Sequence, residues 1–285
     1  MKQDRLASLR DRPGFTFHQL DISDHAALRA LPGVGDVGAV LHLAAQAGVR
    51  YSIENPFAYA QANLLGHLSI LELVRHAPNR PRLVYASSSS VYGANTKAPF
   101  SEEDRVDAPV SLYAATKRAD ELMSETYSRL YGMEQIGLRF FTVYGPWGRP
   151  DMAYWSFTQN ILEGKPIRVF NNGDLQRDFT YIDDVVAGVL SVLLKSPPRA
   201  GALHRIYNIG NNRPERLMRF IEVLEQAIGK KAEKIFEPMQ PGDVQATYAD
   251  ISALNRDYGF EPRTPLEEGL PRFVDWYRSW HRPPV

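Results

Sequence analysis

Residues 83–93 have the sequence Leu-Val-Tyr-Ala-Ser-Ser-Ser-Ser-Val-Tyr-Gly, and this stretch decides the fold class of the chain. It begins with a short apolar run that is typical of a buried strand, and a run of serines follows. In open α/β sheets, ligands bind outside the carboxyl ends of the strands. The stretch therefore predicts a sheet whose ligand-binding edge carries hydroxyl groups.

Strands and helices are expected to alternate on both sides of this stretch, which is the signature of a parallel sheet wound by crossover helices. Strands are predicted at Phe15–Ile22, Val37–Leu43 and Gln135–Phe141, and helices at Asp24–Leu31 (capped by Ser23), Asn55–His76 and Val110–Leu130. Proline and glycine interrupt the second half more often. There we predict helices at Ala153–Glu163, Asp183–Leu194, Leu217–Ile228 and Pro265–Trp280, and strands at Ile167–Phe170 and Ile206–Ile209.

The composition excludes several classes of function. Lys plus Arg and Asp plus Glu both number 33, and no basic stripe of the kind that binds nucleic acid is present. The chain contains no cysteine, its histidines are scattered, and no apolar run is long enough to span a bilayer. We therefore expect a cytoplasmic protein with no metal site, no nucleic-acid partner and no membrane partner.

Tyr113 and Lys117 form a Tyr-x-x-x-Lys pair, whose spacing places both side chains on one face of a helix. A tyrosine that acts as a base near pH 7 needs its pKa lowered from about 10 to about 7, or roughly 4 kcal/mol, which a nearby ammonium helps to supply. Taken alone, the pair also fits a solvated helix face, and the serine run also fits a flexible polar turn. Their occurrence together favours a catalytic interpretation.

A strand, then Ser-Ser-Ser-Ser-Val-Tyr-Gly, then Tyr-x-x-x-Lys on a helix resembles the extended short-chain dehydrogenase/reductase family, which includes NAD-dependent sugar-nucleotide epimerases and dehydratases. The resemblance implies a doubly wound parallel sheet of the Rossmann type with a smaller α/β substrate-binding cap. It implies that Tyr113 takes the proton of the sugar 4-hydroxyl, that Lys117 stabilises the phenolate and contacts the nicotinamide ribose, and that Ser88 is the catalytic serine.

The resemblance also implies contacts to NAD and to a UDP-sugar. The residues expected to contact the cofactor are Asp21, Ile22, Ala44, Ala45 and Asn63, together with Tyr113 and Lys117. Those expected to bind the substrate are Ser89, Ser90, Thr142, Arg149, Val169, Phe170, Arg177 and Asp243. Of these, Arg177 matches the arginine that contacts the diphosphate, Val169 and Phe170 are expected beside the uracil, and Asp243 at its ribose. Ordinary cap packing is the alternative for Val169, Phe170 and Asp243.

Residues 141–152, Phe-Thr-Val-Tyr-Gly-Pro-Trp-Gly-Arg-Pro-Asp-Met, resemble UDP-glucuronate 4-epimerases and their bacterial relatives in capsule polysaccharide biosynthesis. A uronic acid brings a carboxylate, and a guanidinium suits that group, so Arg149 is the first candidate, with a plain surface arginine as the alternative. We expect an isomerase that converts UDP-glucuronate to UDP-galacturonate through a 4-keto intermediate. Another NAD-dependent nucleotide-sugar epimerase or a decarboxylase is the alternative, and Ser89-Ser90 in place of an Asp-Glu pair argues against a dehydratase.

The family opens with a Gly-x-x-Gly-x-x-Gly turn that binds the NAD pyrophosphate, and no such segment occurs in this chain. We therefore expect the first βαβ unit to be absent, with residues 1–141 (also receiving about 180–209) forming an incomplete NAD-binding domain and 142–285 an interleaved cap. A non-catalytic remnant that binds only a nucleotide sugar or a partner is then a further alternative. By the same resemblance, helices 55–76 and 110–130 imply a homodimer.

Overall fold

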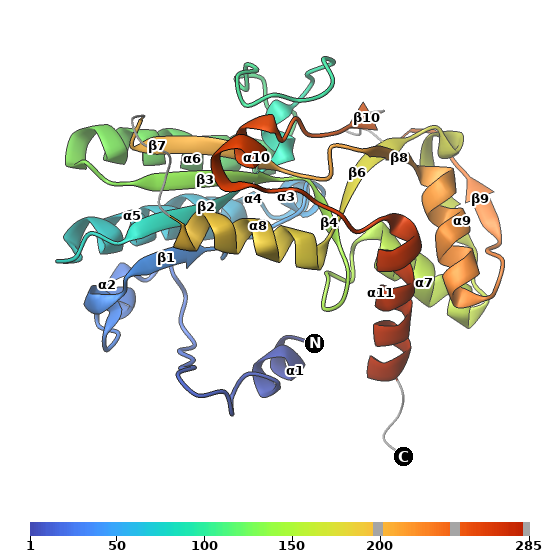
Figure 1. The fold of residues 1–285 in the computed structure, drawn as a ribbon, viewed down its shortest axis with the longest axis horizontal. Coiled ribbons are helices and arrows are strands. Elements are labelled where there is room, and N and C mark those ends of the chain that lie inside the picture. The colour runs from blue at the N-terminus through green and yellow to red at the C-terminus, as the bar shows by residue number, and fades with distance from the viewer. Residues whose placement is uncertain (196–201, 240–245, 282–285) are drawn as a thin grey trace.

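The computed structural model describes residues 1–195, 202–239 and 246–281. Its main sheet has the strand order β1-β2-β3-β7, and every neighbouring pair is parallel (Figure 1). These strands are β1 (Ala39–His42), β2 (Arg82–Ser88), β3 (Gln135–Phe140) and β7 (His204–Ile209). The predicted parallel sheet is confirmed, and β2 with its serines lies inside the sheet between β1 and β3.

Alternate side chains of β2 enter two different cores, so the sheet is covered on both faces. Leu83 and Tyr85 pack with apolar residues of α5 (Gly66–His76), whereas Val84 packs with residues of α8 (Ile182–Leu194). This alternation is the period of a strand whose two faces are both buried. Helix α6 (Leu112–Tyr131) lies beside α5, and α10 (Ser252–Tyr258) packs near α8 and β7.

The predicted helix 55–76 contains an irregularity that positions a polar side chain. It consists of α4 (Pro56–Tyr59), the π-helical segment η2 (Ala60–Leu65) and α5, and the Asn55 side chain caps its start by accepting from Ala58 N. Wider turns of this kind are common at functional sites. Here the π-helical segment carries Asn63, which is buried.

The N-terminal segment departs from prediction. Residues 15–22 form no strand, and Phe15 and Phe17 are 36% and 48% exposed. A strand exists only where a neighbour completes its hydrogen-bond ladder, and among the described residues no strand lies beside this segment. The elements present are α1 (Lys2–Ala7), α2 (His25–Arg29) and η1 (Val34–Asp36). Asp24, not Ser23, caps α2 by accepting from Ala27 N.

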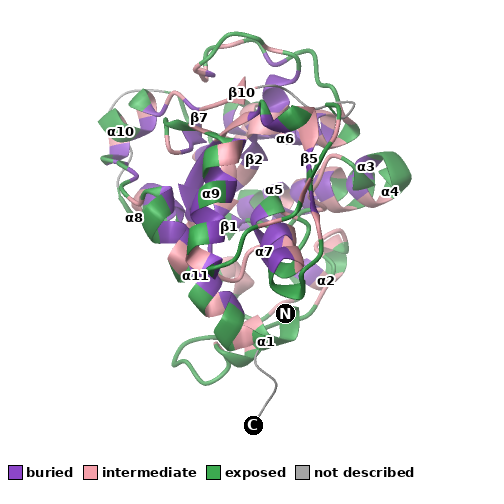
Figure 2. Ribbon diagram, turned by 90° about the vertical axis from the view of Figure 1, so that its right-hand side faces the viewer, coloured by how far each residue is buried: buried purple, intermediate pink, exposed green. Residues whose placement is uncertain are grey.

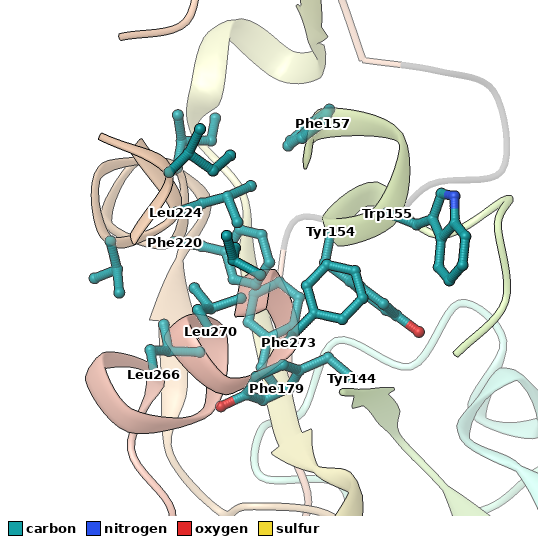
Figure 3. Packing of buried hydrophobic residues seen from close by; sticks show 14 of the residues in the cluster. Tyr144, Tyr154, Trp155, Phe157, Phe179, Phe220, Leu224, Leu266, Leu270 and Phe273 are labelled. Atoms are coloured by element: carbon teal, nitrogen blue, oxygen red, sulfur yellow. The ribbon is translucent and has the colours of Figure 1, made fainter. Parts of the chain in front are cut away.

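The second half builds the cap around an aromatic core. One small sheet consists of β4 (Thr142–Tyr144), β6 (Gln176–Tyr181), β8 (Pro214–Arg216) and β10 (Ala246–Thr247), and another of β5 (Ile167–Val169) and β9 (Lys234–Phe236). Its helices are α7 (Ala153–Glu163), α9 (Leu217–Ile228) and α11 (Leu266–Trp280). Figure 3 shows Tyr154, Phe179, Phe220 and Phe273 meeting between these helices, and Figure 2 shows the buried residues on their inward faces. The cap thus has a core of its own.

Candidate active site

The serine run changes structure halfway along. Ser87 and Ser88 are the last residues of β2, and Ser88 caps the 3-10 helix η3 (Ser89–Tyr92) by accepting from Ser90 N at 3.2 Å. Ser87 is buried and donates to Glu121 Oε1 at 2.6 Å. All four serines border one cavity, but Ser87 is committed to this internal hydrogen bond. Ser88, Ser89 and Ser90 are therefore the hydroxyls that can meet a ligand.

Tyr113 stands in the first turn of α6, and its side chain faces the same cavity. The helix starts there because Ser111 accepts from Ala114 N at 3.1 Å, which satisfies one of the free N–H groups of the first turn. The Tyr59 ring lies edge-on to the Tyr113 ring at 6.1 Å between centroids. The structure therefore brings the serine strand and this helix together at one cavity, as predicted from the sequence.

Lys117 lies one turn further along α6 and is almost fully buried. Its Nζ atom forms an ion pair with Asp120 Oδ2 at 2.7 Å, and the two side chains are 3% and 1% exposed. Burial raises the pKa of Asp120 to about 6, and the Lys117 ammonium opposes that rise. Sequence reasoning missed Asp120, although its spacing of three residues from Lys117 on a helix was a usable signal.

Asn63 connects three segments of the site. Its Oδ1 atom accepts from Gln46 N at 2.8 Å, and its Nδ2 atom donates to Gln46 O at 3.1 Å and to Thr116 Oγ1 at 2.9 Å. The loop after β1, which contains Ala44 and Ala45, is thereby held against the helix that carries Tyr113. Asn63 therefore joins this loop to α6, and its contact with the cofactor stays a prediction.

Asp21 and Ile22 lie in the N-terminal segment, and Ile22 contacts the start of α5. Asp21 Oδ1 accepts from the backbone N and the hydroxyl of Ser23, and these bonds lower the pKa of Asp21. A Cβ atom at Gly66 would lie 2.8 Å from Ile22 Cδ1, so the Ile22 side chain packs closely against the helix backbone there. The candidate cofactor residues thus come from segments that meet around helix 56–76.

Two cavities of about 840 and 580 Å³ share a wall formed by Gly48, Val49, Thr142, Arg149 and Met152. The larger one contains the serines and Tyr113, whereas the smaller one is bordered by Arg50, Phe170 and Arg177. Together they form an elongated site between the sheet and the cap. Val169 is fully buried in the cap core, and Asp243 lies outside the described residues.

Arg149 lies where the two cavities meet. A Cβ atom at Gly48 would be 3.4 Å from Arg149 Nη2, so the guanidinium lies against the loop after β1. Its Nε atom donates to Asp151 Oδ1 at 3.0 Å, and Nη2 donates to Oδ2 of the same carboxylate. Hydrogen bonds from Arg149 lower the pKa of Asp151. In this structure, Arg149 thus forms a two-point contact with the carboxylate of Asp151, and both side chains are partly exposed.

A buried polar network supports the serine end of the site. Arg139 donates to both carboxylate oxygens of Glu121 at 2.8 and 2.9 Å and to the Tyr92 hydroxyl at 3.0 Å. Tyr92 in turn donates to Asn208 Oδ1 at 2.6 Å. Burial alone would raise the pKa of Glu121, but bonds from Arg139 and Ser87 lower it overall. A charged pair with its hydrogen bonds satisfied fixes β2, β3, α6 and β7 relative to one another.

The residues fit the nicotinamide half of NAD better than its pyrophosphate half. Tyr113 shares a cavity with the serines at the end of β2, the Lys117 ammonium lies near His42 at the end of β1, and the braced loop at Ala44 and Ala45 follows β1. A dinucleotide binds at these carboxyl ends in this fold. No Gly-x-x-Gly-x-x-Gly turn for the pyrophosphate occurs in the sequence. The residues present therefore suit the nicotinamide half of NAD and provide no glycine-rich turn for its pyrophosphate.

Among residues 1–195, 202–239 and 246–281, no helix combines the length and the apolar character needed to cross a bilayer. The same described residues contain no group of three or more His, Asp or Glu side chains able to hold a metal ion.

A doubly wound parallel sheet, a serine-bearing strand end and a Tyr-x-x-x-Lys helix define the short-chain dehydrogenase/reductase class of enzymes. Residues 2–210 match the NAD dependent epimerase/dehydratase family, and the chain belongs to that family. It is thus an enzyme of the NAD-dependent nucleotide-sugar epimerase type.

The chain is also similar to named proteins and to solved structures. The chain is 48% identical to Protein CapI of Staphylococcus aureus, across 99% of this chain and 88% of that protein. It is 48% identical to UDP-glucuronate 4-epimerase 1 of Arabidopsis thaliana, across 99% and 68%. The structure is similar to that of a UDP-glucuronic acid 4-epimerase from Bacillus cereus in complex with UDP-glucuronic acid and NAD, with a TM-score of 0.88, 32% identity and coverage of 98% and 87%.

Proposed function

We propose that the enzyme interconverts UDP-glucuronate and UDP-galacturonate by inverting the sugar at C4. The observation that carries the proposal is Arg149, a guanidinium already engaged with a carboxylate at the junction between the serine and tyrosine cavity and the Phe170 cavity. The named relatives of Arabidopsis thaliana and Bacillus cereus support the choice of a UDP-uronate.

The chain's own residues account for proton movement at C4. Tyr113 removes the proton of the 4-hydroxyl as C4 is oxidised to the 4-keto intermediate, and it returns the proton when the keto group is reduced. Ser88 donates a hydrogen bond to the same oxygen, and Lys117 keeps a positive charge beside the phenolate. NAD, when bound, supplies reversible hydride transfer at C4. The reaction would therefore invert C4 without net oxidation of the sugar.

The substrate carboxylate is proposed to replace Asp151 on Arg149. A bidentate pair between a guanidinium and a carboxylate is geometrically specific, and Asp151 shows that this loop can form one. Thr142, Ser89 and Ser90 border the same cavity and add hydroxyl donors. The nucleotide is assigned to the second cavity, where Phe170 offers an apolar ring and Arg177 a positive charge for the diphosphate.

The reaction is tested by incubating the protein with UDP-glucuronate and NAD and identifying the product by NMR. We expect the C4-inverted uronate, and Tyr113→Phe should abolish turnover while leaving nucleotide-sugar binding nearly intact. A decarboxylated pentose product, or turnover of UDP-glucose but not of UDP-glucuronate, would reject the substrate assignment.

The role of Arg149 is tested separately. Arg149→Ala should raise KM for UDP-glucuronate roughly 10-fold or more, because a charge-assisted hydrogen bond is worth about 1.5–3 kcal/mol. Binding of UDP-glucose should change little. The matched control is Arg219→Ala, which removes an exposed cap arginine paired with Glu267. If Arg149→Ala weakened the binding of UDP-glucuronate and of UDP-glucose equally, Arg149 would not be the residue that binds the carboxylate.

Cofactor binding is expected to be weak in these 285 residues, because they contain no glycine-rich pyrophosphate turn. These 285 residues, purified alone, should therefore carry little NAD, and added NAD should be needed for turnover. Protein that retains NAD through purification would show that another segment anchors the pyrophosphate.

We also propose a two-fold homodimer formed by the helical layer of α4, η2, α5 and α6. This layer exposes large apolar side chains, among them Phe57, Leu65, Leu122 and Leu130, at 84%, 47%, 52% and 66%. Closed two-fold dimers bury such faces against themselves. Light scattering should show a dimer for the native chain and a monomer for Leu122→Lys, and a native monomer at micromolar concentration would contradict the proposal.

A further inference from the structure

The loop at residues 145–149 has a strained backbone, and it carries Arg149. Trp147 has φ +61° and Gly145 has φ +139°. A bulky side chain at positive φ is uncommon, and it persists only where the surroundings hold it in place. The position of Arg149 thus depends on whatever holds Trp147 and Gly148.

The cap grips this loop from one side. The Trp147 ring packs against Trp276 and Trp280 of α11, at 5.1 and 6.3 Å between ring centroids. A Cβ atom at Gly148 would lie 1.7 Å from the Tyr154 hydroxyl oxygen, so α7 touches the backbone there. These contacts fix the Trp147 side chain and one edge of the loop, but they do not satisfy the carbonyl groups of Trp147 and Gly148.

The N-terminal helix supplies the missing donor. Arg5 of α1 donates from Nη2 to the carbonyl oxygens of Trp147 and Gly148, the second at 3.3 Å. It also borders the larger cavity together with Tyr113 and Arg149. Its buried Nε atom has no hydrogen-bond partner among the described residues. A guanidinium from the start of the chain is therefore inserted into the wall of the candidate active site.

We infer that Arg5 is a positioning residue for Arg149 and thereby a determinant of specificity for an acidic sugar. Its charge-assisted hydrogen bonds hold the two carbonyls in the orientation that positive φ at Trp147 requires. Without Arg5, the loop relaxes toward ordinary backbone angles, and Arg149, the next residue, leaves the junction of the two cavities. The inference rests on the proposed function for the identity of the acidic group.

The binding test is a double-mutant cycle measured by calorimetry with UDP-glucuronate and UDP-glucose. Arg5→Ala should weaken UDP-glucuronate binding by about 10-fold and UDP-glucose binding by less than about 3-fold. In the Arg149→Ala background, Arg5→Ala should have little further effect on UDP-glucuronate. Lys2→Ala, which removes an exposed charge from the same helix, should behave as wild type.

Two results would overturn the inference: equal losses for both sugars, or losses of Arg5→Ala and Arg149→Ala that simply add. The steady-state constants should show the same selective effect on substrate binding. Arg5→Ala should raise KM for UDP-glucuronate about 10-fold with kcat nearly unchanged, because the proton-transfer residues are not touched.

A readout without ligand separates this inference from the proposed function. All four tryptophans of the chain, Trp147, Trp155, Trp276 and Trp280, lie in one aromatic cluster beside α1. Arg5→Ala should therefore shift the intrinsic fluorescence of the ligand-free protein, whereas Lys2→Ala should not. Unchanged emission in Arg5→Ala overturns the positioning role. A shift in a protein that does not bind UDP-glucuronate supports that role and rejects the proposed substrate.

Discussion

The cap core and the N-terminal edge of the main sheet use apolar side chains in opposite ways. In the cap, Phe220 and Phe273 are fully buried, and the Phe273 ring meets the Tyr154 ring edge-on at 4.9 Å (Figure 3). At the sheet edge, β1 is paired on one side only among the described residues, and Leu41 and Leu43 are 36% and 52% exposed.

The two regions also differ in their buried polar groups. Beside β1, the rings of His42 and His67 stack at 5.4 Å, and the His67 ring lies 5.0 Å from that of Tyr85. The cap core consists mainly of aromatic and aliphatic residues, with Thr158, Asp178 and Glu225 buried beside them. The cap is thus stabilised by aromatic packing, whereas the β1 edge buries histidines whose pKa values are lowered by burial.

The largest effect should come from emptying the cap core. Phe273→Ala is expected to lower the free energy of unfolding by about 3–5 kcal/mol, because a fully buried ring leaves a cavity. Phe17→Ala, which removes an exposed ring from the N-terminal segment, should change it by less than about 0.5 kcal/mol. Urea unfolding followed by tryptophan fluorescence measures both, and similar losses for the two variants would erase the contrast.

Acid should weaken the sheet edge before the cap. Burial, and then the nearby Lys117 charge, lower the pKa of His42 to about 4, whereas an unfolded histidine titrates near 6.5. Between these values the unfolded chain binds more protons than the native one, so stability is present above pH 6.5 and is lost as pH falls to 4. The loss from His42 alone is about 3 kcal/mol.

Hydrogen exchange at pH 7 and pH 4.5 can locate this loss. Amides of β1 and β2 should lose protection at the lower pH before those of α9 and α11. His42→Gln should flatten the pH dependence, whereas the control His18→Gln, at an exposed position, should leave it unchanged. Simultaneous loss of protection in the cap would show that the two regions unfold as one unit.

The smallest change in stability is expected for a substitution at the edge of β1, whose main effect should be on aggregation. An unpaired, apolar strand edge is a template for pairing with another chain, and a lysine on such an edge opposes that pairing. Leu41→Lys should reduce aggregation at raised protein concentration while costing less than about 1 kcal/mol of stability. Leu194→Lys alters a 74% exposed leucine at the end of α8 and serves as the control. If both variants reduced aggregation equally, the cause would be the change in net charge and not the β1 edge.

Much of the fold was predictable because its signals are local. The boundaries of α7 and α9 were predicted to the residue, and those of β3 and α11 to within one. The apolar period of a helix or strand is set by neighbouring residues, so it survives in the bare sequence. The resemblance to the family likewise rests on contiguous motifs, and the family match confirms it.

The failures share a different cause. Residues 15–22 have the pattern of a strand, but a strand needs a partner, and none lies beside them among the described residues. The widened helical turn at Asn63 also escaped prediction, because it depends on what packs against the helix.

The sequence by itself determined the parallel sheet, the serine strand and the Tyr113–Lys117 helix, since each is encoded in a short continuous segment. Only the tertiary structure decided that Arg149 lies at the junction of two cavities and that Arg5 contacts the loop that carries it. Arg5 and Gly148 are 143 residues apart. The physical reason is that a contact across such a separation forms only after the sheet, α1 and the cap have packed, and local sequence pattern carries no record of that distance.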